Sequence, residues 1–129
     1  MSKKVLAFLL SAIMCFGVLG GALSASAKAV ESVHLDSTES SDSSGNVTGT
    51  YMYYWGNNSK NSKHSVYLIA RYKGIVAWYE DSSKLMQAGY SLSESNAIRT
   101  KTRSSTKWFV RLNPEGAGNT GCTANGYIK

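Results

Sequence analysis

The chain has 129 residues, with 14 Lys and Arg against 8 Asp and Glu, and with 3 Trp, 8 Tyr and 3 Phe. This length allows one domain. A disulfide framework and a four-ligand structural zinc site are both excluded, because the chain has only two Cys, and Cys15 lies in an apolar N-terminal segment far from Cys122. The composition therefore indicates a small, basic, aromatic-rich globular domain.

Residues 1–27 have the pattern of a secretory signal peptide. Lys3 and Lys4 precede a long apolar run, which ends at the small-x-small motif Ala25-Ser26-Ala27. The alternative is an uncleaved membrane anchor, for which the apolar run is nearly long enough. The cleavage motif favours removal, so we predict a secreted, extracellular product that begins at Lys28 and is not an integral membrane protein.

Residues 28–45 differ in charge from the rest of the chain. They contain one base and four acids (net −3), whereas residues 46–129 contain eleven bases and four acids (net +7). Residues 37–45 are Ser-rich and have no apolar side chain to bury, which is typical of a flexible linker or the end of a short pro-segment. We therefore expect an acidic leader, either retained or trimmed near Val47, ahead of a folded domain.

Residues 46–112 are predicted to form an all-β domain, a small antiparallel β-sandwich. Short β-rich runs alternate with turn residues at close spacing, and no helical pattern intervenes. Strands are expected over residues 48–55, 64–72, 75–79, 89–93, 96–103 and 107–112, with a tight hairpin turn at Lys73-Gly74 and a polar turn over residues 80–84. The predicted core is Tyr53, Trp55, Val66, Leu68, Val76, Trp78, Trp108 and Val110.

Residues 113–129 are predicted to be a Gly-rich C-terminal tail. Asn113-Pro114 should end the last strand, since proline lacks an amide donor and restricts the residue before it. Four glycines follow, which favours mobility, with at most an edge strand through Tyr127-Ile128. In such a tail Cys122 would be an exposed thiol, either a spectator or the site of an adventitious dimer.

The chain offers little material for catalysis. His64 and Ser65 are neighbours, but adjacent residues of a strand point to opposite faces. Glu80-Asp81 lies in a Ser-rich turn, where Asp is common for backbone reasons, and the Gly-rich run at 116–121 lacks the lysine of a phosphate loop. We therefore expect no enzyme activity, no catalytic residue, no metal site and no cofactor.

The strongest functional signal is a basic and aromatic surface. Arg99, Lys101 and Arg103 recur at the strand period and should share one face, with further bases on the next strand. Such a stripe can bind a polyanion or a pyrophosphate head group, although an ordinary solvated face has the same composition. Secretion separates the protein from intracellular nucleic acid. The predicted target-binding residues are Arg99, Lys101, Arg103, Lys107, Arg111, Tyr51 and Tyr54.

Several short motifs occur in the order found in a known family. Gly49-Thr50-Tyr51 is followed by Lys63-His64-Ser65-Val66, a glycine turn, Ala88-Gly89-Tyr90 and a terminal aromatic run. This arrangement resembles the lactococcin 972 family of secreted bacteriocins over residues 47–112, about half of the precursor. Tyr51 stands where that family usually has Trp, and the residues from Asn113 onward have no counterpart in it.

The resemblance implies a compact β-sandwich exported by the general secretory route. It also implies killing of related Gram-positive bacteria by interference with septal cell-wall synthesis. The implied partner is the lipid-linked wall precursor or an anionic wall polymer, and an immunity or transporter protein is a further candidate partner. Two other classes stay open: a non-toxic secreted binding or inhibitor module that recognises the same envelope components or a protein partner, and, third, a small wall-active enzyme.

Overall fold

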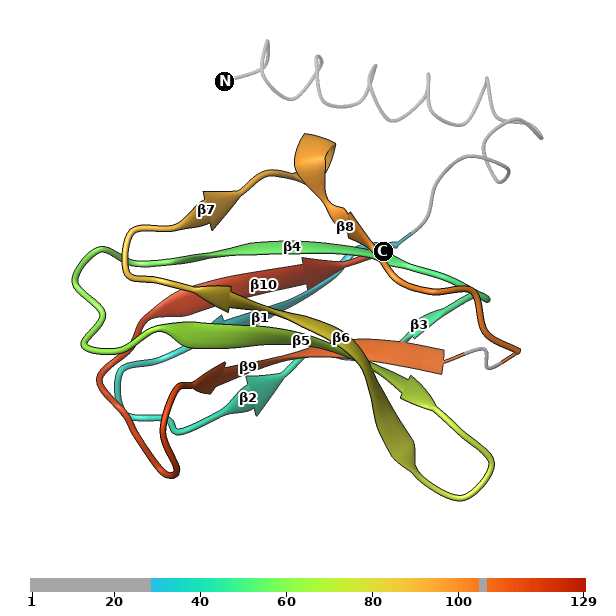
Figure 1. The fold of residues 1–129 in the computed structure, drawn as a ribbon, viewed down its shortest axis with the longest axis horizontal. Coiled ribbons are helices and arrows are strands. Elements are labelled where there is room, and N and C mark those ends of the chain that lie inside the picture. The colour runs from blue at the N-terminus through green and yellow to red at the C-terminus, as the bar shows by residue number, and fades with distance from the viewer. Residues whose placement is uncertain (1–28, 105–106) are drawn as a thin grey trace, which may run out of the picture.

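A computed structural model describes residues 29–104 and 107–129, which form ten β-strands and one short 3-10 helix (Figure 1). The predicted signal peptide, residues 1–27, lies outside the described residues. None of the helices in the described part of the chain is long and apolar enough to cross a membrane. In chain order the elements are β1 (Glu31–Leu35), β2 (Asp42–Ser43), β3 (Val47–Thr48), β4 (Tyr53–Asn58), β5 (Val66–Lys73), β6 (Trp78–Met86), β7 (Ser91–Leu92), η1 (Glu94–Asn96), β8 (Ile98–Arg99), β9 (Lys107–Pro114) and β10 (Ala124–Ile128).

The strands form two antiparallel five-stranded sheets that pack face to face, so the predicted β-sandwich is confirmed. The first sheet has the order β1-β10-β4-β7, with β8 also paired to β4. The second sheet has the order β2-β9-β5-β6, with β3 also paired to β9. The β5–β6 hairpin extends beyond the rest of the sandwich at the lower right of Figure 1.

The second sheet is centred on β9 and β5. Along β9 the buried side chains alternate with partly or fully exposed ones, and Trp108, Val110 and Leu112 are completely buried. Register places Ala70 opposite Val110 and Leu68 opposite Leu112, so the apolar sides of both strands face the first sheet. This alternation is the period of two that identified both strands in the sequence.

The N-terminal segment is part of the sandwich, whereas residues 28–45 were predicted to be an acidic leader or linker ahead of the folded domain. β1 pairs along its whole length with β10, and it buries Val33 and Leu35 in the core. β2 pairs with β9. The Ser-rich residues between these strands form only a connection, so the folded domain starts before residue 46 rather than at it.

The C-terminal segment also differs from the prediction. β10 is an interior strand between β1 and β4, not an edge strand at the end of a mobile tail. Gly126 explains part of this placement, because a Cβ atom there would lie 2.9 Å from Cδ1 of Leu68 in the facing sheet. The glycine therefore serves close packing between the sheets, and the domain extends to Ile128 rather than ending at residue 112.

The core contains only part of the predicted set. Val66, Leu68, Trp108 and Val110 are fully buried and Trp55 is nearly so, as predicted, whereas Tyr53 and Trp78 are only half-buried and Val76 is exposed. On β4 the inward-facing aromatic ring is Tyr54, which the sequence had placed on the opposite face from the predicted core. The buried hydrophobic cluster consists of Val33, Leu35, Val47, Met52, Tyr54, Val66, Leu68, Ala70, Met86, Trp108, Val110, Leu112, Cys122, Ala124 and Ile128.

The β5–β6 hairpin is present, but its turn is longer than the predicted Lys73-Gly74 turn. β5 ends at Lys73 and β6 begins at Trp78, and the N–H of Gly74 donates a 2.7 Å hydrogen bond to the carbonyl of Ala77. Ile75 and Val76 therefore belong to the turn instead of a strand. The polar residues 80–84, predicted to be a turn, lie inside β6.

Candidate functional site

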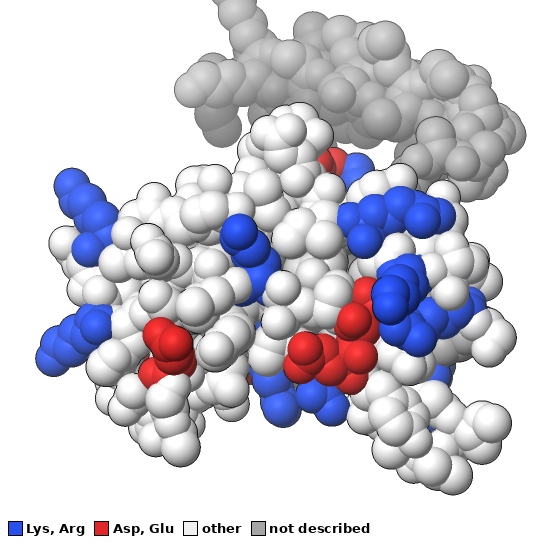
Figure 2. All heavy atoms as spheres, in the orientation of Figure 1, with Lys and Arg blue, Asp and Glu red and all other residues white. Residues whose placement is uncertain are grey.

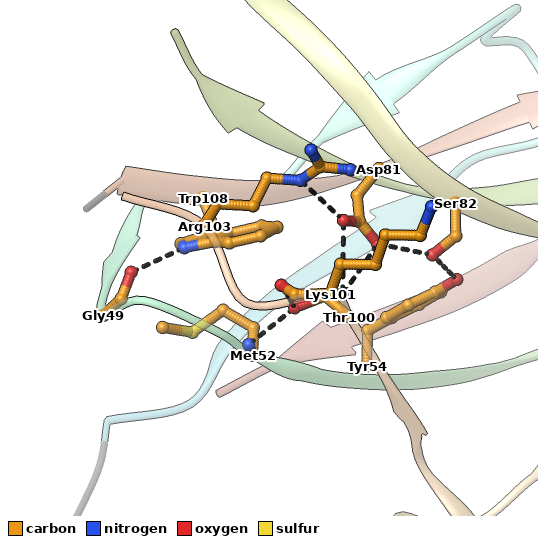
Figure 3. A network of polar contacts seen from close by, with 9 residues as sticks. All are labelled: Gly49, Met52, Tyr54, Asp81, Ser82, Thr100, Lys101, Arg103 and Trp108. Carbon is orange, nitrogen blue, oxygen red and sulfur yellow. Dashed lines mark hydrogen bonds and ion pairs between the residues drawn. The ribbon is translucent and has the colours of Figure 1, made fainter. Parts of the chain in front are cut away.

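The candidate site lies at the end of the sandwich where residues 99–104 cross from the first sheet to the second. Its centre is Asp81 on β6, whose side chain is only 1% exposed (Figure 3). The carboxylate accepts a 2.9 Å hydrogen bond from Nε of Arg103 and one of 2.9 Å from the hydroxyl of Ser82. The N–H of Lys101 lies 3.3 Å from both carboxylate oxygens. Asp81 thus fixes the crossing segment to β6.

This network continues into the core through Tyr54. The phenol oxygen of Tyr54 on β4 and the hydroxyl of Ser82 on β6 are 2.8 Å apart, so the hydrogen bond joins the two sheets. Burial raises the pKa of Tyr54, and the negative charges of Asp81 and Glu80 raise it further, although the bond to Ser82 opposes this shift. Tyr54 therefore stays protonated and can act as a structural hydrogen-bond donor.

Thr100 anchors the other side of the crossing segment. Its side chain is buried, and its Oγ1 accepts a 2.9 Å hydrogen bond from the N–H of Met52. The N–H of Thr100 donates to the carbonyl of Met52, and the N–H of Arg103 donates to the carbonyl of Thr50. Residues 100–103 are therefore held in a defined non-strand conformation by bonds from both the β3–β4 connection and β6.

A cavity of about 590 Å³ lies between this segment and the β5–β6 turn. Tyr72 is one of the residues that line it. The ring centroid of Tyr72 lies 4.1 Å from Cζ of Arg103 and 5.5 Å from the ring centroid of the buried Trp108. Three cations and three hydroxyl-bearing side chains line the cavity, a composition suited to an anion. The lining residues are Tyr72, Lys73, Gly74, Ile75, Thr102, Arg103, Ser104 and Lys107.

The charge of this cavity is only partly neutralised. The ion pairs formed between described residues are Arg103 with Asp81 and Lys129 with Glu94, so Lys73 and Lys107 have no acidic partner there. Much of the Lys and Arg surface visible in Figure 2 gathers at this end of the sandwich, above the β5–β6 turn. The arrangement can supply two mobile ammonium groups and one positioned guanidinium to a phosphate-bearing ligand.

The predicted single-strand stripe of Arg99, Lys101 and Arg103 is wrong. β8 ends at Arg99, whose guanidinium lies 4.1 Å from the ring centroid of Tyr51 at the edge of the first sheet. Lys101 is exposed and does not line the cavity, whereas Arg103 does. The buried Asp81 causes this arrangement, because its bonds to the segment replace the ladder that a strand would need.

The other predicted binding residues also separate. Lys107, the first residue of β9, lines the cavity. Arg111 lies on the outward side of the second sheet, and its Nε donates a 3.1 Å hydrogen bond to Oγ of Ser43. Tyr51 is half-buried beneath Arg99, and Tyr54 is completely buried. Tyr54 therefore cannot contact a ligand directly, contrary to the prediction, but it supports the network behind the cavity.

Residues of other reactive types lie outside the cavity. Cys122 is buried rather than exposed, and its thiol lies 3.4 Å from the carbonyl oxygen of His64. Glu80 and Asp81 do not form a pair, because Asp81 is buried in its network while Glu80 is exposed. Among the described residues, no group of three or more His, Cys, Asp and Glu side chains could hold a metal ion.

Sequence reasoning missed Tyr72 and Lys73 as site residues. The sequence pattern predicts Lys73 only as a turn residue and Tyr72 only as one end of an alternating strand. Both reach the cavity because β5 continues to Lys73 and the turn then bends beside Arg103. No local pattern carries this information, since it depends on contact between segments about 30 residues apart.

Comparison with protein-family models, with curated proteins and with solved structures found no match to this chain. The interpretation of the site therefore depends on its own geometry. The resemblance to the lactococcin 972 bacteriocins contributes only to the proposal below.

Proposed function

We propose that the processed chain is a secreted, bacteriocin-like antibacterial protein that acts at the Gram-positive cell envelope by binding an anionic component. The observation that carries this proposal is the cavity beside the β5–β6 turn, where Lys73, Arg103 and Lys107 converge. Its volume of about 590 Å³ falls within the range of ordinary small-ligand sites. The predicted signal peptide and the motif resemblance add support for an envelope target.

The charge pattern suits a phosphate or pyrophosphate group. The ion pair with Asp81 and the ring of Tyr72 hold the guanidinium of Arg103 in place, so little side-chain entropy is lost when it binds an anion. Lys73 and Lys107 can follow the ligand as flexible point charges. The head group of a lipid-linked wall precursor and the phosphates of an anionic wall polymer share this chemistry.

The test is growth inhibition of Gram-positive cells by the purified processed chain. We expect inhibition by the wild-type chain and an inhibitory concentration at least about tenfold higher for Lys73→Ser/Lys107→Ser, since each lost charge-assisted contact is worth on the order of 1 kcal/mol. The matched control is Lys60→Ser/Lys63→Ser. It makes the same charge change in the loop before β5, about 23 Å away along that strand.

The outcomes separate the competing functions. Equal potency of the two double variants would overturn the assignment of the cavity. A wild-type chain that binds cells through the cavity without inhibiting growth would overturn the antibacterial function and favour a non-toxic binding or inhibitor module.

A further inference from the structure

The tip of the β5–β6 hairpin carries an unusual apolar surface. Ile75 is 100% exposed and Val76 is 81% exposed, the two highest values among the large hydrophobic side chains of the described residues. In Figure 2 the lobe at the lower right, at the position of this turn in Figure 1, is formed almost entirely by uncharged residues. Two consecutive aliphatic side chains are thus presented to solvent at a protruding point.

Nothing in the turn itself requires these side chains. Turns favour Gly, Pro, Asn, Asp and Ser, whereas β-branched residues favour strands. The turn is nevertheless well defined, because the N–H of Gly74 bonds to the carbonyl of Ala77 and the ring of Tyr79 lies against Gly74. A Cβ atom at Gly74 would lie 2.3 Å from Cε2 of Tyr79, so the glycine is needed for this packing. The hairpin therefore holds its aliphatic tip outward in a fixed conformation.

Aromatic and cationic side chains lie next to the aliphatic tip. Ile75 and Val76 are followed on β6 by Trp78 and Tyr79, and Tyr79 is 44% exposed. Cations lie beside these rings. Lys73 pairs with Trp78 across the hairpin, and its ammonium is 5.6 Å from the ring centroid of Trp78. Arg103 and Lys107 line the cavity that Ile75 also borders. The aliphatic tip is therefore adjacent to amphipathic aromatic rings and to cations, which are the side chains that favour the interface and the anionic head groups of a membrane.

We propose that the β5–β6 turn inserts Ile75 and Val76 into the outer layer of an anionic lipid bilayer, with Trp78 and Tyr79 at the interface and the cavity cations at the head groups. A bilayer is favoured over a protein partner because two highly exposed aliphatic side chains stand next to Lys73, Arg103 and Lys107, a combination that complements hydrocarbon together with anionic head groups. Such insertion is shallow, about 5 to 10 Å, and is strengthened by anionic lipid. The chain would then remain a peripheral protein.

This inference deepens the proposed function, on which it rests for the presence of an anionic envelope surface. It places the cavity where the phosphate of a lipid-linked ligand would lie. The two can fail separately, since vesicle binding requires no growth inhibition, and a soluble wall polymer could fill the cavity without any insertion of the tip.

The experiment uses the processed chain from culture supernatant and vesicles of phosphatidylcholine with or without phosphatidylglycerol. The test variant is Ile75→Ser/Val76→Ser, and the matched control is Val30→Ser/Leu85→Ser, which removes two exposed aliphatic side chains elsewhere. We expect the partition coefficient on anionic vesicles to fall at least about tenfold for the tip variant, with little change for the control. Far-UV circular dichroism and the melting temperature should match the wild type, since the two tip residues bury almost nothing.

Tryptophan fluorescence gives a second readout. Trp108 is fully buried and Trp55 is 8% exposed, so quenching by brominated lipid should come from Trp78 and should disappear in Trp78→Phe. Equal partitioning of the tip variant and the wild type would overturn the proposal. Absence of wild-type binding to anionic vesicles, or equal binding to neutral and anionic vesicles, would overturn it as well.

Discussion

Asp81→Ala tests the polar network that positions the candidate site. The substitution removes the acceptor of Arg103 Nε, of the Ser82 hydroxyl and of the Lys101 N–H, at a position where the carboxylate is only 1% exposed. Losing one member of a buried ion pair costs about 3 to 5 kcal/mol. Because the Arg103 side chain is 26% exposed and can be rehydrated, we expect a smaller loss of about 2 to 4 kcal/mol in the free energy of unfolding.

Urea unfolding followed by far-UV circular dichroism measures this loss. For a domain of about 100 residues each kcal/mol corresponds to about 4 to 8 °C, so the melting temperature should fall by at least about 8 °C. The neighbouring Glu80→Ala is the control, since Glu80 is exposed and forms no ion pair among the described residues. Its effect should stay within about 0.5 kcal/mol.

A double-mutant cycle with Arg103→Ala identifies the physical cause. If the ion pair is responsible, the two substitutions should be less than additive, with a coupling energy of about 1 kcal/mol or more. Equal effects of Asp81→Ala and Glu80→Ala, or full additivity with Arg103→Ala, would refute the network as the element that fixes residues 99–104.

Three further predictions concern the rest of the fold. Cys122 is buried, so it should resist a thiol reagent in the folded chain and react fully after denaturation; rapid reaction of the native protein would contradict its placement. Because burial raises the pKa of Tyr54, the unfolded state loses this proton first, and stability should fall as pH rises above about 10. Tyr54→Phe should flatten that decline, and an unchanged slope between pH 10 and 12 would count against it. A chain that starts at Val47 lacks β1, with the buried Val33 and Leu35, and should give no cooperative thermal transition; cooperative melting would restore the view that residues 28–45 are a dispensable leader.

The sequence predicted the sandwich class because alternation along β5 and β9 is a local property. Val66, Leu68, Trp108 and Val110 are buried as their spacing of two predicted. Alternation was uninformative on β4, where both sides carry aromatic residues, and it therefore assigned Tyr54 to the wrong face. Periodicity identifies the buried side of a strand only when the side chains on its two sides differ in polarity.

The errors at the ends of the chain have another cause. β1 and β10 are neighbours although they lie about 90 residues apart in sequence, and their pairing leaves no local pattern. Serine and glycine content predicts flexibility, whereas Gly126 allows close packing between the two sheets. The local composition of these segments predicts loops. In the folded chain they form strands because they pair with each other over a long distance in sequence.

The sequence predicted some of the residues of the candidate site, but not how they are arranged in space. Arg103 and Lys107 were identified from charge, and the structure brings both to the cavity. The predicted stripe of Arg99, Lys101 and Arg103 is wrong because the segment does not form a strand. Instead, the N–H of Lys101 and Nε of Arg103 form hydrogen bonds to the buried carboxylate of Asp81. The exposed tip could not be predicted either. Ile75 and Val76 are β-branched residues, which favour strands, so the sequence predicts a strand where the structure has a turn.

The central claim is that the cavity cations bind a phosphate-bearing envelope component. The most direct measurement is binding of the processed chain to neutral phosphatidylcholine vesicles with and without lipid-linked wall precursor, at low and at physiological salt. The account predicts binding that depends on the precursor, weakens with salt, is lost in Lys73→Ser/Lys107→Ser and persists in Lys60→Ser/Lys63→Ser. Binding that is independent of the precursor, or equal for the two double variants, would contradict it.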